Sequence, residues 1–278
     1  MKLAFCFLTR ADLLQAALWQ EFFAAGPAAD FAIYCHPKEP DAVTSPVLAG
    51  RVIERRVPTS PAHISLVEAT LALFAAAFRA DDANEYFILL SESTIPIMSF
   101  GEIYAELSAA QSCSLIAWQA CLPGSEHYGR LSNIADGARF ANPFYSHDQW
   151  IVLHRRHVGA LLEKSYLADF ARVFAPDEHY FMNVLVHALR VPLDQLVNRR
   201  TSFVSWLDPE VRSTTDPATG RLLSRTIHPK TFTSLSAWDL FGAQNHWFLR
   251  KVTASCDCSL ALARVRSPAA WRNPRPIS

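Results

Sequence analysis

The run Leu3-Ala4-Phe5-Cys6-Phe7-Leu8 (LAFCFL, residues 3–8) decides the fold class of this chain. Six consecutive apolar residues predict a strand that is buried on both faces of a sheet. Residues 11–24 then show the apolar periodicity of a helix, and residues 31–35 (FAIYC) form a second apolar run. A strand, a helix and a second strand in this order are typical of a parallel sheet covered by helices.

The same alternation continues through the first half of the chain. We expect strands at residues 85–90 and 114–118, a short strand at 53–57, and helices at 65–78 and 100–110. The fold class predicted from this pattern is α/β, with a Rossmann-like, mostly parallel central sheet flanked by helices.

The second half is more irregular. We expect strands at 149–153 and 201–207, helices at 157–162, 166–174 and from 177 onward, and a hairpin or loop at 208–225. No linker divides the chain, so we predict one domain over residues 1–278. Its parts are a nucleotide-binding half (1–120), an acceptor and catalytic half (121–263) and a poorly packed, proline- and arginine-rich tail (264–278).

Composition limits the function. The chain has 278 residues, of which 50% are hydrophobic, and a formal net charge of zero. It can bury a large core, and its charge gives no reason to expect a nucleic-acid partner. Its 9 glycines form no GxGxxG and no P-loop motif, and GxSxG and HExxH are absent from the sequence. A Rossmann dinucleotide site and the hydrolases that carry those motifs are therefore disfavoured.

The compartment is predicted from the first residues and the cysteines. The apolar run at residues 3–8 is shorter than the apolar region of a signal peptide, and no apolar run is long enough to span a membrane. We expect a cytoplasmic protein with reduced thiols, and a peripheral association with a membrane is left open. Cys256 and Cys258 form a CxC without a matching second pair, so we expect a structural role and not a zinc site.

Polar turns follow three of the predicted strands: Thr9-Arg10, His36-Pro37-Lys38 and Ser91-Glu92-Ser93. Each could be a simple strand terminator. Because parallel strands place their carboxyl ends at one edge of a sheet, the three turns together predict a ligand cleft.

Two adjacent carboxylates, Asp177 and Glu178, stand in APDEHYF (175–181), where a loop becomes an amphipathic helix. A carboxylate there is held by a rigid element yet faces solvent, which suits a general base. The alternative is that acidic residues simply favour the first turn of a helix.

Short motifs in a fixed order resemble the core-2/I-branching N-acetylglucosaminyltransferase family, and most closely its shorter plant and bacterial branch. They are IYCHPKEP (33–40), SLVEATLALF (65–74), YFILLSESTIPI (86–97), HDQWIVLHRRHV (147–158), PDEHYF (176–181), TSFVSW (201–206), IHPKTF (227–232) and WFLRKV (247–252). The resemblance implies a GT-A type glycosyltransferase fold and inverting transfer from a UDP-sugar, with GlcNAc or a xylose-like sugar as donor group. A glycan or glycolipid is the implied acceptor, and no cofactor or divalent metal is expected.

Charge neutralisation at the leaving diphosphate is the step that a metal usually performs. Many sugar transferases hold that metal with an Asp-x-Asp, which this chain lacks, and Glu92 is the single carboxylate in the corresponding turn. The resemblance instead assigns the diphosphate to Lys230 and Lys251, with Arg250 as a neighbour that could share the task. Lys230 stands where some animal members have arginine. Without the resemblance, these cations would be read as a solvated surface cluster.

The resemblance also assigns roles to other residues. Glu178 falls on the catalytic base, and Asp177 is then a helix cap or a supporting carboxylate. Trp206 falls on an acceptor-stacking tryptophan, for which a buried core position is the alternative. Arg130 is a candidate for acceptor binding.

The remaining predicted contacts lie at the strand ends. Thr9 and His36 are the expected neighbours of the uridine, and Glu92 is grouped with the acceptor side.

Two other functions stay open at this point. A non-catalytic nucleotide- or carbohydrate-binding protein could keep this fold without the reaction. A metal-dependent hydrolase would have to use the histidines, but the pairs His154/His157 and His179/His187 match no known ligand spacing. The presence of a base and of both cations favours the transferase.

Overall fold

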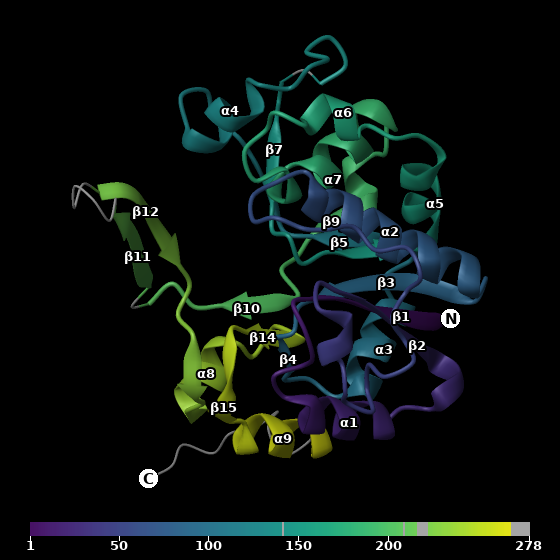
Figure 1. The fold of residues 1–278 in the computed structure, drawn as a ribbon. Helices are drawn as coiled ribbons and strands as arrows, with labels where there is room; N and C mark the ends of the chain where they lie inside the picture. The colour runs from purple at the N-terminus through teal and green to yellow at the C-terminus, as the bar shows by residue number, and fades with distance from the viewer. Residues whose placement is uncertain (141, 208, 216–221, 268–278) are drawn as a thin grey trace.

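The computed structural model describes residues 1–140, 142–207, 209–215 and 222–267. Its centre is a sheet of strand order β2-β1-β3-β8-β5-β9 (Figure 1). These strands are β1 (Lys2–Thr9), β2 (Phe31–Pro37), β3 (Asn84–Leu90), β5 (Ser114–Ile116), β8 (Val152–His154) and β9 (Leu196–Asn198). Strand β8 runs antiparallel to its neighbours β3 and β5, and the other neighbouring pairs are parallel. The predicted α/β class with a mostly parallel sheet is therefore confirmed.

Strand β1 is buried on both faces. Leu3, Phe5 and Phe7 enter one core cluster, and Ala4 and Cys6 enter the other. All five are fully buried. The continuous apolar run is thus explained by helices packed against each side of the strand.

Helices cover the two faces of the sheet in separate groups (Figure 1). One face carries α1 (Ala16–Ala24) and α3 (Phe100–Ser108), and α9 (Ser259–Arg266) packs against α1. The other face carries α2 (Ser65–Ala80), α5 (Arg155–Glu163), α7 (Tyr180–Asn183) and a turn of π-helix at Val184–Ala188. The remaining helices are short: α4 (Glu126–Leu131), α6 (Leu167–Phe170), α8 (Ala237–Gly242), and 3-10 turns at Ala28–Asp30, Pro40–Ala42, Pro176–Glu178 and Leu193–Gln195.

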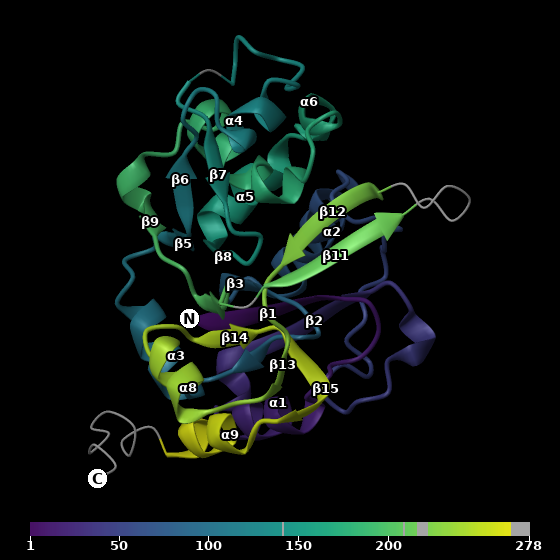
Figure 2. The same cartoon turned by 90° about the vertical axis from the view of Figure 1, so that its left-hand side faces the viewer.

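Smaller sheets are built against the central one. Strand β14 (Phe248–Arg250) lies between β10 (Ser202–Val204) and β4 (Ile95–Pro96), and β13 (Phe232–Ser234) pairs with β15 (Val252–Asp257). Strands β6 (Trp118–Ala120) and β7 (Tyr145–His147) form an antiparallel pair. The hairpin of β11 (Glu210–Thr215) and β12 (Leu222–His228) projects from the body of the protein (Figure 2).

Several predicted elements are wrong in extent. The helix expected over residues 11–24 begins at Ala16, because the Asp12 carboxylate accepts hydrogen bonds from Leu13, Thr44 and Ser45 and holds residues 12–15 as a loop. The strand expected at 53–57 is a single bridge between Cys35 and Val52. The segment expected as one strand at 114–118 is divided between β5 and β6.

The second half differs more from expectation. The helix expected from residue 177 is broken into 3-10, α and π turns, and the helix expected at 166–174 is reduced to α6. The poorly packed tail was predicted to begin at residue 264, but α9 continues to Arg266. The Arg264 guanidinium is packed against the body of the protein and donates to the backbone oxygens of Leu240 and Gln244. Residues 268–278 lie outside the described part of the chain, as do residues 208 and 216–221 of the predicted hairpin. The division into halves stays a prediction.

All six cysteines are free thiols, as expected, and Cys256 and Cys258 are buried in the core cluster under α8 and α9. In the described ranges, no helix combines the length and the apolarity that crossing a membrane requires.

Substituting Trp19 by alanine tests the packing against β1. The Trp19 ring is fully buried against Phe5 and Phe7, and its Nε1–H donates to the Thr94 oxygen at 2.9 Å. We expect Trp19→Ala to lower the free energy of unfolding by about 3–5 kcal/mol in urea titrations. Trp238 is 82% exposed, so Trp238→Ala is the control and should change stability by less than about 0.5 kcal/mol. Equal effects of the two substitutions would contradict this packing.

Candidate active site

The carboxyl ends of the parallel strands define one edge of the central sheet, which is where α/β proteins bind ligands. Backbone hydrogen bonds tie all three predicted polar turns to neighbouring segments at this edge. The Lys38 N–H donates to the Thr9 oxygen at 2.9 Å, and the Val252 N–H donates to the Ser93 oxygen at 3.0 Å. The second bond places Lys251 beside the turn that contains Glu92.

The side chains of Thr9 and His36 are buried and make hydrogen bonds to the protein backbone. The Thr9 hydroxyl donates to the Ala11 oxygen at 2.7 Å. The His36 Nε2 accepts a hydrogen bond from the Val57 N–H at 2.9 Å, and burial lowers the pKa of this imidazole. They are 6% and 1% exposed, respectively, so both side chains serve the framework of the edge.

Backbone pairing brings the predicted cations together. The Phe232 N–H donates to the Lys251 oxygen at 2.8 Å, and the Lys230 N–H donates to the Ser205 oxygen at 3.0 Å. Val204 and Arg250 are partners in the β10–β14 pair. The segments that carry Lys230, Arg250 and Lys251 therefore converge at this edge, together with the residue before Trp206.

Trp206 is 55% exposed. The alternative of a buried core tryptophan is therefore wrong, and the indole face is open to a partner.

Arg250 is partly buried and lies against an aromatic ring. Its guanidinium carbon lies 4.4 Å from the centroid of the Trp150 ring. Burial lowers its pKa to about 10, and the negative charges of Glu92 and Asp148 act in the opposite direction. Arg250 therefore stays cationic at neutral pH and is held beside the predicted strand-end carboxylate.

Glu178 belongs to a second charged group. Its Oε2 accepts a hydrogen bond from Arg130 at 3.1 Å, and Arg130 also pairs with Glu126 at 2.5 Å. The Arg130 guanidinium carbon lies 5.0 Å from the centroid of the Phe174 ring. The Glu178 side chain is 43% exposed, so the expected combination of a fixed backbone and an open carboxylate is present.

Asp177 is the competing carboxylate, and it is buried, at 7% exposure. Burial and the charge of Glu178 raise its pKa to about 6. Among the described residues its Oδ1 has no hydrogen-bond partner, and it caps neither short helix of this segment, so the predicted capping role is wrong. A perturbed pKa can mark a functional group, but an enclosed carboxylate cannot reach a substrate hydroxyl. Of the two carboxylates, Glu178 is therefore the candidate base.

Two histidines that the sequence patterns did not single out together complete the Glu178 group. His127 Nδ1 and His179 Nε2 are 3.5 Å apart, and a Glu178 oxygen lies within 4.8 Å of both ligand atoms. Burial lowers the pKa of His179 to about 3. The approach of His127 to Glu178 depends on where the fold places α4, which no sequence spacing could reveal.

The other histidines considered above make structural contacts. His157 Nδ1 is 2.7 Å from the Ser114 hydroxyl, and His187 Nε2 is 3.0 Å from the Pro143 oxygen. Both imidazoles therefore make contacts within the fold.

A short piece of chain connects the two charged groups. His179 Nδ1 is 3.4 Å from the Tyr145 oxygen, and Trp150 stacks on Arg250. The five residue steps from 145 to 150 extend over at most about 18 Å. The Cα atoms of Tyr145, next to His179, and of Trp150, next to Arg250, are therefore no more than about 18 Å apart.

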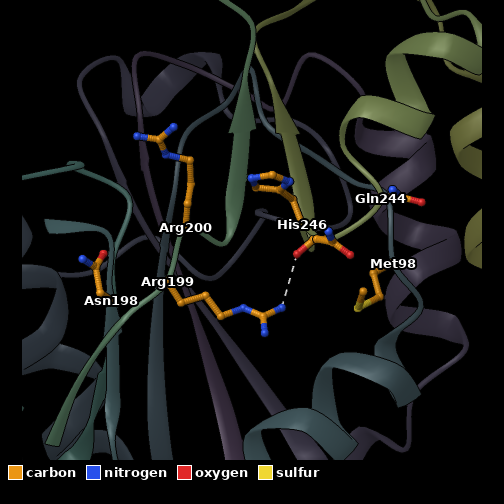
Figure 3. Close-up of a pocket in the computed structure, with 7 residues that line it drawn as sticks. Met98, Asn198, Arg199, Arg200, Gln244 and His246 are labelled. Carbon is orange, nitrogen blue, oxygen red and sulfur yellow. Dashed lines mark hydrogen bonds between the residues drawn. The ribbon is translucent and has the colours of Figure 1, made fainter. Parts of the chain in front are cut away.

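Figure 3 shows a cavity of about 440 Å³. Its lining residues are Met98, Asn198, Arg199, Arg200, Gln244, Asn245 and His246. Arg200 pairs with Asp148 at 2.5 Å, and Arg199 donates to the Asn245 oxygen at 3.3 Å. Asp148 is also one of the charges that acts on Arg250, so the cavity and the cation group share a carboxylate.

The cavity was not predicted, because strand β9, which contributes Asn198 to its lining, was not predicted. The signal for it was the pair Arg199-Arg200 directly after that short strand.

Comparison with known proteins shows the family of the chain. The family model of the Core-2/I-Branching enzymes matches residues 3–236. The chain therefore belongs to the Core-2/I-branching enzyme family, and the predicted resemblance is confirmed. Arg250 and Lys251 lie beyond the matched range.

A curated relative, glycosyltransferase BC10 of Oryza sativa subsp. japonica, is 24% identical over 238 residues. The match covers 74% of this chain and 57% of that relative. The predicted enzyme class, a glycosyltransferase, is thus the class that the family and this relative define.

Two solved structures are similar over 67% of this chain and 70% of theirs, at 11% identity. They are an active-site mutant of LgtC, with a TM-score of 0.37, and the galactosyltransferase LgtC in complex with donor and acceptor sugar analogs, with a TM-score of 0.36.

The raised pKa of Asp177 predicts how stability depends on pH. The native carboxyl keeps its proton up to about pH 6, whereas the unfolded chain loses it near pH 4. The native state therefore holds the extra proton in this window, and stability should fall as the pH rises from about 4 to 7, by on the order of 2–3 kcal/mol. Asp177→Asn should flatten this part of the curve of unfolding free energy against pH.

Glu178→Gln is the matched control for this titration. It should keep most of the slope, because burial, the larger cause of the Asp177 shift, remains. An equally steep curve in Asp177→Asn would show that another group is responsible.

Proposed function

We propose that this protein is an inverting, metal-independent glycosyltransferase that moves a sugar, GlcNAc or a xylose-like residue, from a UDP-sugar to a hydroxyl of a glycan or glycolipid. The observation that carries the proposal is the half-exposed Glu178 carboxylate, which is ion-paired to Arg130. Residues 145–150 connect the neighbouring His179 to Arg250 at the sheet edge. A cytoplasmic location is part of the proposal, which the six free thiols support.

Glu178 acts as the general base. Its carboxylate accepts the proton of the acceptor hydroxyl while that oxygen forms the new bond to the anomeric carbon. The bond from the anomeric carbon to the diphosphate oxygen breaks on the opposite face, which inverts the configuration. The leaving diphosphate needs no proton, so a single carboxylate is sufficient, unlike in a glycosidase.

Lys230, Lys251 and Arg250 stabilise the charge that develops on the diphosphate. Fixed cations perform this task without reorganisation when they are held in place before the reaction. The backbone pairing of β13 with β15 holds the segments of Lys230 and Lys251, and the Trp150 ring lies against Arg250. The negative charge of Glu92 raises the pKa of Arg250, and we assign Glu92 to this donor side.

The other contacts belong to the two substrates. The strand ends at Thr9 and His36 face the uridine, and the exposed indole of Trp206 stacks on the acceptor sugar. Arg130 aligns the Glu178 carboxylate beside the acceptor, and buried Asp177 supports the turn that carries it.

The substitution Glu178→Gln tests the base. It keeps the shape of the side chain and removes its basicity, so we expect transfer to fall about 10²–10⁴-fold while UDP affinity changes little. Glu126→Gln is the matched control, because Glu126 pairs with the same Arg130 from an exposed position. Product formation and UDP binding are measured for both, and an active Glu178→Gln enzyme would rule out this base.

The substitution Lys251→Ala tests the cations. Loss of one charge-assisted contact to a phosphate costs about 1.5–3 kcal/mol, which corresponds to roughly 10–100-fold weaker UDP binding. Lys164→Ala is the control, because Lys164 is an exposed lysine beside the Tyr166 ring and is not one of the proposed diphosphate contacts. Thermal shifts with UDP should be reduced in Lys251→Ala, retained in Lys164→Ala and unchanged by EDTA. Loss of the UDP shift on chelation would contradict metal independence.

The second candidate is a non-catalytic nucleotide- or carbohydrate-binding protein. It would bind UDP without turnover, and Glu178→Gln would then change nothing that can be measured. The carboxylate–arginine pair at Glu178 favours the enzyme, because a binding protein has no need for an aligned base.

A further inference from the structure

Three potential metal ligands meet at the Glu178 group. The ligand atoms of His127, Glu178 and His179 all lie within 4.8 Å of one another. They come from α4 and from the turn before α7, so the fold joins elements that are distant in sequence. Two imidazoles and one carboxylate form a donor set that protein zinc sites use.

The hydrogen bonds of His179 orient its ring for coordination. A backbone carbonyl can only accept a hydrogen bond, so at the 3.4 Å contact with the Tyr145 oxygen the His179 Nδ1 carries the proton. The lone pair of Nε2 then points toward His127. A ligating histidine that donates its other N–H to a backbone carbonyl is the usual outer-shell arrangement of zinc sites.

The distances fit one small cation. Two nitrogens bound to Zn²⁺ at about 2.05 Å and at a tetrahedral angle lie about 3.3 Å apart. The two imidazole nitrogens here are 3.5 Å apart. A carboxylate has two oxygens, so Glu178 can keep one on Arg130 while the other rotates toward the histidines.

We propose that His127, Glu178 and His179 form a binding site for Zn²⁺, and that Zn²⁺ bound there inhibits the enzyme. The binding site stands on the geometry alone. The inhibition rests on the proposed function, because a metal that takes the Glu178 carboxylate removes the lone pair that would accept the acceptor's proton. This site is separate from the diphosphate, where lysines and an arginine supply the positive charge.

Direct titration tests the site. Zn²⁺ is added to the metal-free protein in competition with a chromophoric chelator, and the wild-type protein should bind one equivalent tightly. His127→Ala should weaken this binding at least about tenfold, the smallest loss that substitutions around such sites cause. Glu178→Gln should weaken it similarly. His127 is partly exposed on α4, so its replacement leaves the core intact.

Glu126→Gln is the matched control, because it removes a carboxylate from the same arginine without touching the three ligands. It should bind Zn²⁺ like the wild type. Replacement of Zn²⁺ by Co²⁺ should give a spectrum of nitrogen and oxygen ligands without thiolate absorption, which excludes the six cysteines. No binding by the wild type, or equal binding by all variants, would overturn the site.

Transfer assays distinguish the two proposals. Zn²⁺ should inhibit sugar transfer by the wild type, and at least about tenfold more Zn²⁺ should be needed to inhibit His127→Ala. Zn²⁺ binding that depends on His127 in a protein without transferase activity would remove the proposed function and leave the site standing. Active enzyme whose Zn²⁺ inhibition is the same with and without His127 would overturn the inhibitory role.

Discussion

Burial of β1 on both faces is the constraint on which the rest of the structure depends. A strand that is fully enclosed needs hydrogen-bonding neighbours on both edges and apolar helices on both faces. Its partners β2 and β3 run parallel to it, so their carboxyl ends lie at one edge of the sheet. The polar turns collect there because the apolar strands leave no other place for charges near the centre of the molecule.

Charge pairing organises that edge into two groups. One carries fixed cations beside a strand-end carboxylate, and the other carries a carboxylate held by Arg130. Three of these cations have an aromatic ring against them: Trp150 for Arg250, Phe232 for Lys230 and Phe174 for Arg130. Aromatic faces stabilise a cation without neutralising it, so these side chains stay available for negatively charged groups.

The fold and the site differ in how far they could be predicted. The strands and long helices of the first half follow from apolar periodicity, because burial of one face imposes that pattern locally. Glu178 and Arg130 were each proposed as site residues, but their ion pair was not. Strand β9 and the cavity at Arg199 were missed, because three residues are too few for a periodic signal. The helix after Pro176 was overextended, since its apolar spacing does not record the changes between 3-10, α and π turns.

The amino-acid order by itself determined the α/β class, the edge of the sheet that holds the site and, through its ordered motifs, the family. These features depend on local periodicity and on residue types, which can be read along the chain. The tertiary structure alone decided that Asp177 is enclosed while Glu178 is open, and that His127 reaches the same carboxylate. Such outcomes depend on the packing of segments far apart in sequence, because a rotation of a helical turn by about 180° would exchange its buried and its exposed face.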